Sequence, residues 1–187
     1  YGTTYTSCAD LVEKEEACIN SDSYGNNNGN NNNSLKLNII DHTNNNLIKS
    51  RIHTGEINYN WGRGQILDSG KSNNVILEFT GFIKVPNTKN YTFRTTSDDG
   101  VRLTINSDLI INDWTIHGAT NNDSGKIRLE KDIFYPIKLE YYEAGGGAAL
   151  KLLWKEEGKD FVIVPSDVFY SESVLPHMRE HLYFKFN

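Results

Sequence analysis

The stretch VILEFTGFIKV, residues 75–85, decides the fold of this chain. Its large apolar side chains recur at every second position, while Glu78 and Thr80 take the positions between them. Successive side chains of a strand point to opposite faces, so a period of two predicts a strand with one face buried. Pro86-Asn87 follows directly and marks its end.

Similar short alternations recur along the chain, separated by turns such as Asn106-Ser107-Asp108. They lie at residues 91–96, 101–105, 109–111, 127–130, 137–141, 150–154 and 161–164. Strands that recur every ten or so residues, without a helical period between them, are typical of an antiparallel sandwich or barrel. The sequence therefore predicts an all-β fold with at least about eight strands and little helix.

Length and charge limit the function. The chain has 187 residues and a net charge of −5, which suits one domain and argues against a nucleic-acid or anionic membrane surface. No apolar run approaches the ~18–20 residues that a membrane-spanning helix needs, so membrane insertion is not expected. The chain begins at Tyr1 without a signal peptide, and we interpret it as part of a larger secreted or cell-surface protein.

Three regions are expected along the chain: a leader over residues 1–34, a β-sandwich domain over 35–170 and a tail over 171–187. The leader contains an Asn-rich run at 26–33, which has nothing to bury and is predicted to be a flexible loop.

Several features favour an extracellular setting. Cys8 and Cys18 are the only cysteines, and a lone pair in a secreted chain predicts a disulfide, with two reduced thiols in a cytosolic protein as the alternative. The N-glycosylation acceptor pattern occurs at Asn32, Asn90 and Asn122.

A series of motifs follows one order along residues 35–170. They are INYNWG at 57–62, GFIKVP at 81–86, YTF at 91–93, SDDGVRL at 97–103, INDW at 111–114, LEYYE at 139–143 and LLW at 152–154. In this order they resemble the PA-fourteen domain, a family named for the anthrax protective antigen. The resemblance implies an antiparallel β-sandwich in a secreted or cell-surface protein, because members occur in fungal adhesins and flocculins, in glycosidases and in binary toxins.

The resemblance also implies a calcium site at Asp98-Asp99, because the sugar-binding members hold calcium through neighbouring Asp residues joined by a cis peptide. Calcium takes about six to eight oxygen ligands, so a second loop must contribute. The candidate is the loop EAGGG, where Glu143, Gly145 and Gly147 would supply oxygens. The alternative is an ordinary polar turn, in which Asp accepts backbone N–H groups.

The pair and four other residues are the candidates for contacting a ligand: Asp98, Asp99, Asp113, Trp114, His117 and Glu143. We favour a half-buried Trp114 at a strand end over an indole that stacks on a sugar, and we expect Trp61 and Trp154 in the core. His117 is expected to be a lone imidazole without a carboxylate at ligand spacing, so metal binding by it is not predicted.

No arrangement predicts catalysis. Adjacent Asp98 and Asp99 cannot flank a glycosidic bond from two sides, a Gly-x-Ser-x-Gly elbow is missing, and the glycines at 145–147 lack the Lys-Ser/Thr of a phosphate loop. The sequence predicts a secreted or surface module that binds glycans through Ca²⁺, with multivalent display compensating for weak sites. The alternatives are an interaction or scaffold domain of an adhesin or toxin subunit, which Glu143 in place of the adhesins' Asn favours, and an accessory domain of a glycosidase.

Overall fold

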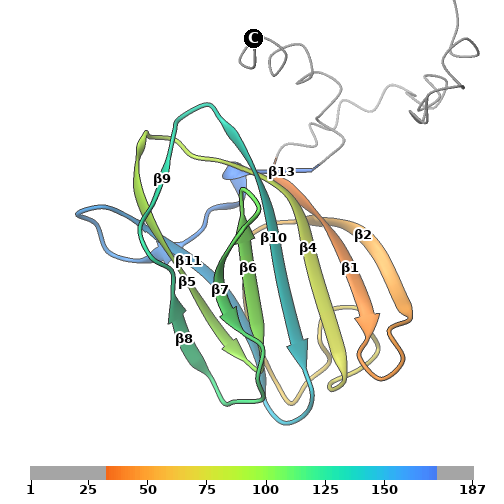
Figure 1. The fold of residues 1–187 in the computed structure, drawn as a ribbon. Coiled ribbons are helices and arrows are strands. Elements are labelled where there is room, and N and C mark those ends of the chain that lie inside the picture. The colour runs from red at the N-terminus through yellow and green to blue at the C-terminus, as the bar shows by residue number, and fades with distance from the viewer. Residues whose placement is uncertain (1–32, 172–187) are drawn as a thin grey trace, which may run out of the picture. The chain divides into compact units, whose positions relative to one another are not determined.

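Two antiparallel sheets pack face to face over one core in the computed structural model, which describes residues 33–171 (Figure 1). The first sheet has the order β2-β1-β4-β10-β6-β7, with β13 also paired to β4. Its strands are β2 (Leu47–Thr54), β1 (Ser34–Asp41), β4 (Val75–Lys84), β10 (Phe134–Glu143), β6 (Val101–Ile105), β7 (Asp108–Asp113) and β13 (Phe169–Tyr170).

The second sheet has the order β12-β11-β5-β8, with β3 paired to β11 and β9 paired to β5. Its strands are β12 (Val162–Ile163), β11 (Ala148–Glu156), β5 (Lys89–Asp98), β8 (Thr120–Asp123), β3 (Asn58–Gly62) and β9 (Ile127–Leu129). Within the described residues the helix is limited to a single 3-10 turn, Ser166–Val168. The prediction of an all-β antiparallel sandwich is confirmed.

The alternation of β4 matches the two faces of the first sheet, in which this strand lies between β1 and β10. Its buried residues alternate strictly with half-buried ones from Val75 to Lys84, so one face fills the core and the other stays partly in contact with solvent. Trp154 is 5% exposed and packs near Tyr91 and Phe93. Trp61 is half-buried and stacks on Tyr59 at a ring distance of 4.8 Å, packed against the same core.

One end of the sandwich gathers the acidic strand ends. Asp41 ends β1 and pairs with Val75 at the start of β4, which in turn pairs with Glu143 at the end of β10. In the second sheet Asp98 ends β5 and pairs with Ala149 of β11. We call this end, at the bottom of Figure 1, the carboxylate end.

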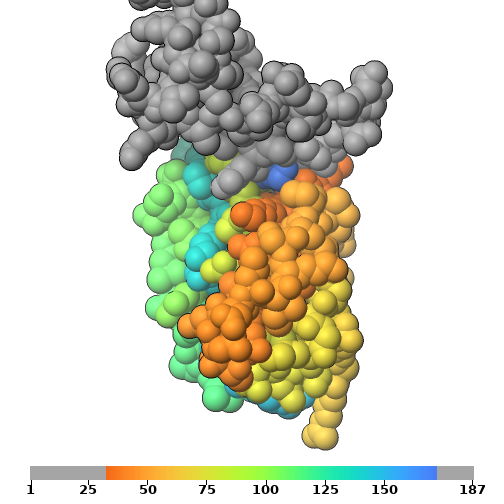
Figure 2. All heavy atoms as spheres, turned by 90° about the vertical axis from the view of Figure 1, so that its right-hand side faces the viewer, coloured from red at the N-terminus to blue at the C-terminus, as the bar shows by residue number. Residues whose placement is uncertain are grey.

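The edge of the first sheet is braced by a loop. β2 is the outermost strand, and its Lys49 and Arg51 bind Asp68 in the loop between β3 and β4, with N–O distances of 2.5 and 3.1 Å. Figure 2 faces this edge and shows the orange residues of β1 and β2 beside the yellow residues that follow β3. The loop is thereby held against the sheet, and its far end reaches the carboxylate end.

Some predictions concern residues outside the described part of the chain. Cys8, Cys18 and Asn32 lie there, as do the other residues of the leader up to position 32 and residues 172–187 of the tail. The described residues contain no helix that is long and apolar enough to cross a membrane.

Candidate functional site

Three carboxylates come together at the carboxylate end. Asp98, Asp99 and Glu143 each offer a carboxylate oxygen, and these oxygens lie within 4.8 Å of one another. The peptide bond between Asp98 and Asp99 is cis, as the resemblance implies for a sugar-binding member. We call these three residues the carboxylate cluster.

A close approach between two strands puts the Asp pair beside Glu143. Gly100 follows the pair, and a Cβ atom at this position would lie 2.3 Å from Cε1 of Tyr142. The amide of Tyr142 donates a hydrogen bond to the Gly100 carbonyl at 2.9 Å. A residue with a side chain would push the β5–β6 turn away from β10, so glycine here keeps the Asp pair next to the end of β10.

Asp99 connects the turn to two distant loops. Its side chain is almost fully buried, and Oδ1 accepts a hydrogen bond from the amide of His117 at 3.0 Å. Oδ2 accepts another from the amide of Ala144, also at 3.0 Å. Bonds from backbone N–H to a carboxylate are stronger than neutral ones. Asp99 therefore does what the polar-turn interpretation requires, although its donors come from other loops.

Glu143 is the deepest member of the carboxylate cluster. It is fully buried; Oε2 lies 3.3 Å from the hydroxyl of Tyr141, and Oε1 has no hydrogen-bond partner among the described residues. Burial, reinforced by the charge of Asp99, raises the pKa of Glu143 to about 7. Burial and the same neighbouring charge also raise the pKa of Asp98. The surroundings of Glu143 and Asp98 therefore do not fully compensate the negative charge of these two carboxylates.

The glycine-rich loop lies directly against the Asp pair. A Cβ atom on Gly147 would be 3.2 Å from Oδ2 of Asp98, closer than side chains usually approach, so glycine leaves room for this carboxylate. The amide of Gly146 donates to Oδ1 of Asn73 at 3.3 Å. Sequence reasoning missed Asn73, which lies in the polar turn just before β4; that turn was the available signal.

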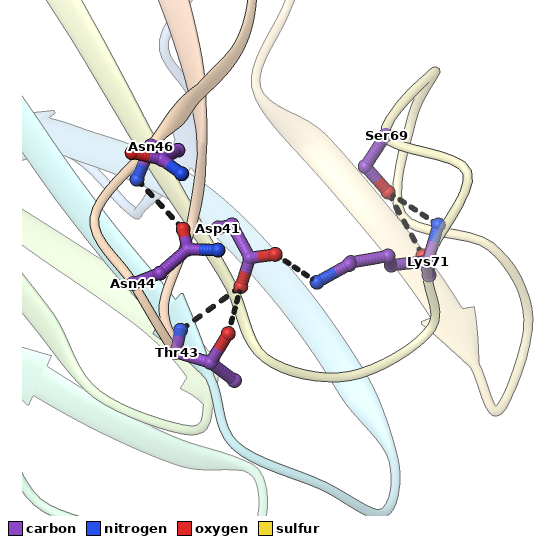
Figure 3. Close-up of polar contacts among 6 residues, drawn as sticks. All are labelled: Asp41, Thr43, Asn44, Asn46, Ser69 and Lys71. Atoms are coloured by element: carbon purple, nitrogen blue, oxygen red, sulfur yellow. Dashed lines mark hydrogen bonds and ion pairs between the residues drawn. The ribbon is translucent and has the colours of Figure 1, made fainter.

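A polar network fixes the loop that carries Asn73 (Figure 3). Lys71 forms an ion pair with Oδ2 of Asp41, and its carbonyl accepts a bond from the Ser69 hydroxyl at 2.9 Å. Oδ1 of Asp41 accepts both the amide and the hydroxyl of Thr43. These bonds, with Lys71 first, lower the pKa of Asp41 to about 2. The β1–β2 turn thus holds the β3–β4 loop two residues from Asn73.

The loop between β7 and β8 has its own network around Asp113. Oδ1 accepts the hydroxyl of Thr115 at 2.7 Å, and Oδ2 accepts the side-chain amide of Asn122 at 3.0 Å. Nε2 of His117 is 3.3 Å from Oδ2, so the prediction of a lone imidazole was wrong. The spacing of four residues was the missed signal. These contacts, led by Thr115, lower the pKa of Asp113.

The other predicted residues make these contacts. Trp114 is half-buried; its ring meets Tyr142 edge-on at 4.7 Å, and the guanidinium carbon of Arg102 lies 4.5 Å from its centroid. Two of the predicted N-glycosylation positions are described: the side-chain amide of Asn122 donates to Asp113 as above, and that of Asn90 donates to Glu157 at 2.9 Å.

Comparisons with known proteins agree with this architecture. The PA14 domain model matches residues 22–167. The anti-sigma-I factor RsgI3 of Acetivibrio thermocellus is 35% identical over 116 residues, which are 62% of this chain and 18% of that protein. The protective antigen of Bacillus anthracis is 35% identical over 92 residues, 48% of this chain and 11% of that protein.

Among solved structures, a "PA14 sugar-binding domain from RTX adhesin" superposes with a TM-score of 0.61 at 19% identity, covering 74% of this chain and 98% of that one. The chain spans less than a fifth of the length of the two curated relatives. The fold and the family match over most of the sequence lead to one conclusion: this chain belongs to the PA14 domain family.

Proposed function

We propose that this domain is a non-catalytic binding module whose carboxylate end takes up Ca²⁺ and, through the ion, carbohydrate of a cell surface or matrix. One observation carries the proposal. The carboxylate cluster is largely buried, and Oε1 of Glu143 is enclosed there without a hydrogen-bond partner among the described residues. A buried acceptor that the protein leaves unpaired is a strong reason to expect a cation.

The chemistry of the carboxylate cluster suits calcium. All of its ligand atoms are carboxylate oxygens, which hard cations such as Ca²⁺ prefer, whereas zinc sites use His and Cys. Asp98, Asp99 and Glu143 would hold the ion, and the carbonyls of Gly145 and Gly147 would complete the protein's contribution. Bound calcium would supply coordination positions that vicinal sugar hydroxyls can occupy.

The cation would also relieve an electrostatic cost. Without it, burial, reinforced by the charge of Asp99, raises the pKa of Glu143 to about 7 and also raises the pKa of Asp98. A divalent ion favours the charged form of each group, which is the form that binds it. Binding is therefore expected to release protons near neutral pH.

The geometry also supports a non-catalytic role. Glycoside hydrolysis requires two carboxyl groups that reach the sugar from opposite sides of the bond. Here Asp99 and Glu143 are at most 2% exposed, so they can hold an ion but cannot flank a bound substrate.

Sugar binding and an extracellular setting are supported by similarity. A solved domain with this fold is described as sugar-binding and comes from an adhesin, and the protective antigen of Bacillus anthracis is among the relatives. The alternative is an interaction domain that binds no sugar, which is favoured by the resemblance to an anti-sigma factor. In either case we infer that the module belongs to a larger secreted or surface protein, where several copies could act together.

A glycan array probed in calcium and again in chelator distinguishes the two functions. Our proposal predicts signals that appear with calcium, disappear with chelator and are missing for Asp98→Asn. Asp123→Asn, which changes an exposed acid that pairs with Arg94 outside the carboxylate cluster, is the control and should bind like the wild type. Calcium binding without a glycan signal would support the interaction domain.

A further inference from the structure

Among the described residues, the most exposed large apolar side chain belongs to a loop that donates an amide to the carboxylate cluster. Within the described residues six such side chains are exposed: Leu47, Ile48, Ile52, Leu109, Ile116 and Val162. Ile116 has the largest exposed fraction, 73%, and precedes His117, whose amide is bonded to Asp99. Single exposed apolar residues are common on proteins, so the position of Ile116 matters more than its exposure.

The chain on both sides of Ile116 is fixed. Before it, the hydroxyl of Thr115 donates to Asp113 at 2.7 Å. After it, His117 binds Asp99 through its amide, and its Nδ1 lies 2.8 Å from the carbonyl oxygen of Gly118. A loop whose backbone is held in place before binding loses little conformational entropy when a ligand covers it. The loop therefore presents Ile116 as a pre-organised apolar contact.

This apolar contact is aliphatic, not aromatic. The ring of Trp114, two residues earlier, is covered by the guanidinium of Arg102 at 4.5 Å and meets Tyr142 at its edge. An indole with these neighbours has less surface to offer to the C–H face of a pyranose. A branched aliphatic side chain instead matches a small apolar substituent, such as a methyl group.

We propose that Ile116 gives the site a preference for 6-deoxyhexoses, sugars that carry a methyl group where the parent hexose has a hydroxymethyl group. This inference rests on the proposed function, because sugar hydroxyls must bind the calcium ion while the methyl group covers Ile116. The expected preference is about fourfold, the factor that corresponds to burying one small apolar group. The hydroxymethyl group of the parent hexose would place a polar group against the same side chain.

Matched sugars test the inference. Affinities are measured in saturating Ca²⁺ for L-fucose against L-galactose and for L-rhamnose against L-mannose, since the members of each pair differ only in the 6-hydroxyl group. The proteins are the wild type, Ile116→Ser and Leu109→Ser. Leu109 is 51% exposed but lies near the start of β7, whereas the site adjoins the end of that strand.

At least one pair should show an about fourfold preference for the 6-deoxy sugar in the wild type and in Leu109→Ser, and none in Ile116→Ser. The calcium-induced rise in melting temperature should be equal in all three proteins. Calcium-dependent sugar binding without this preference, or with a preference that survives Ile116→Ser, overturns the inference and leaves the proposed function standing. If none of the four sugars binds and the glycan array is also blank, both are overturned.

Discussion

The two neighbouring aspartates should respond differently to the same substitution, Asp→Asn. Both oxygens of Asp99 accept backbone amides, from His117 and Ala144. In Asp99→Asn one of these amides must face an NH₂ group, which cannot accept, so a buried donor stays unsatisfied. This costs about 1–3 kcal/mol of unfolding free energy even without calcium.

Asp98 offers the matched comparison. The described residues make no hydrogen bond to its carboxylate, and its pKa is raised by burial and by the charge of Asp99. Replacing the Asp98 carboxylate by an amide leaves no hydrogen-bond donor unpaired and removes its repulsion with Asp99. Asp98→Asn should therefore keep the wild-type stability in chelator within about 0.5 kcal/mol, or slightly exceed it.

Urea unfolding in chelator and in calcium separates these effects. At a calcium concentration 100-fold above its dissociation constant, the wild type should gain about 2.7 kcal/mol. Both variants should lose this gain, but only Asp99→Asn should also be destabilised in chelator. If Asp99→Asn were as stable as the wild type in chelator, the role assigned to its two hydrogen bonds would be wrong. If Asp98→Asn were still stabilised by calcium, Asp98 would not be a ligand of the ion.

Three further predictions concern other residues. His53 is buried, and burial, followed by the charge of Arg51, lowers its pKa from 6.5 to about 4. The unfolded chain therefore binds the extra proton first, and as the pH falls from about 7 to 4 the wild type should lose up to about 3 kcal/mol of unfolding free energy relative to His53→Phe. Parallel curves of stability against pH for the two proteins would contradict this. Asn73→Ala should weaken calcium binding severalfold, measured by calorimetry, because Asn73 is bonded to the glycine-rich loop. Since Asn73 is exposed, the unfolding free energy in chelator should change by less than about 0.5 kcal/mol. An unchanged calcium affinity would argue against that role. Trp114→Ala should lower the free energy of urea unfolding by about 2 kcal/mol, because contacts with Arg102 and Tyr142 are lost, and should leave calcium binding intact. A loss of calcium binding with full stability would show that Trp114 serves the ion site and not the packing.

The sequence predicts the strands whose apolar pattern is local. In β4 and β5 one face is buried, so the period of two is visible in the residues themselves. β2 is different, because it forms the edge of its sheet and exposes Leu47, Ile48 and Ile52. Its apolar residues show no alternation, and the sequence alone therefore gave no individual prediction for this strand.

The carboxylate cluster was predictable in part. The Asp pair follows from its motif, and the burial of Glu143 could have been found, because it shares the parity of buried Leu139 and Tyr141 in β10. A polar turn could have marked Asn73 as a candidate, but which residues the supporting contacts join could not be predicted, since they connect distant segments. The donors to Asp99 lie 18 and 45 residues along the chain, and Asn73 lies 73 residues from Gly146.

A calorimetric titration of Ca²⁺ into the chelator-treated domain tests the central claim most directly. Our account predicts one ion per domain in the wild type and none in Asp98→Asn, with protons released near pH 7 as Glu143 becomes fully ionised. The absence of a binding heat in the wild type, or an equal heat in Asp98→Asn, would show that the carboxylate cluster does not hold calcium.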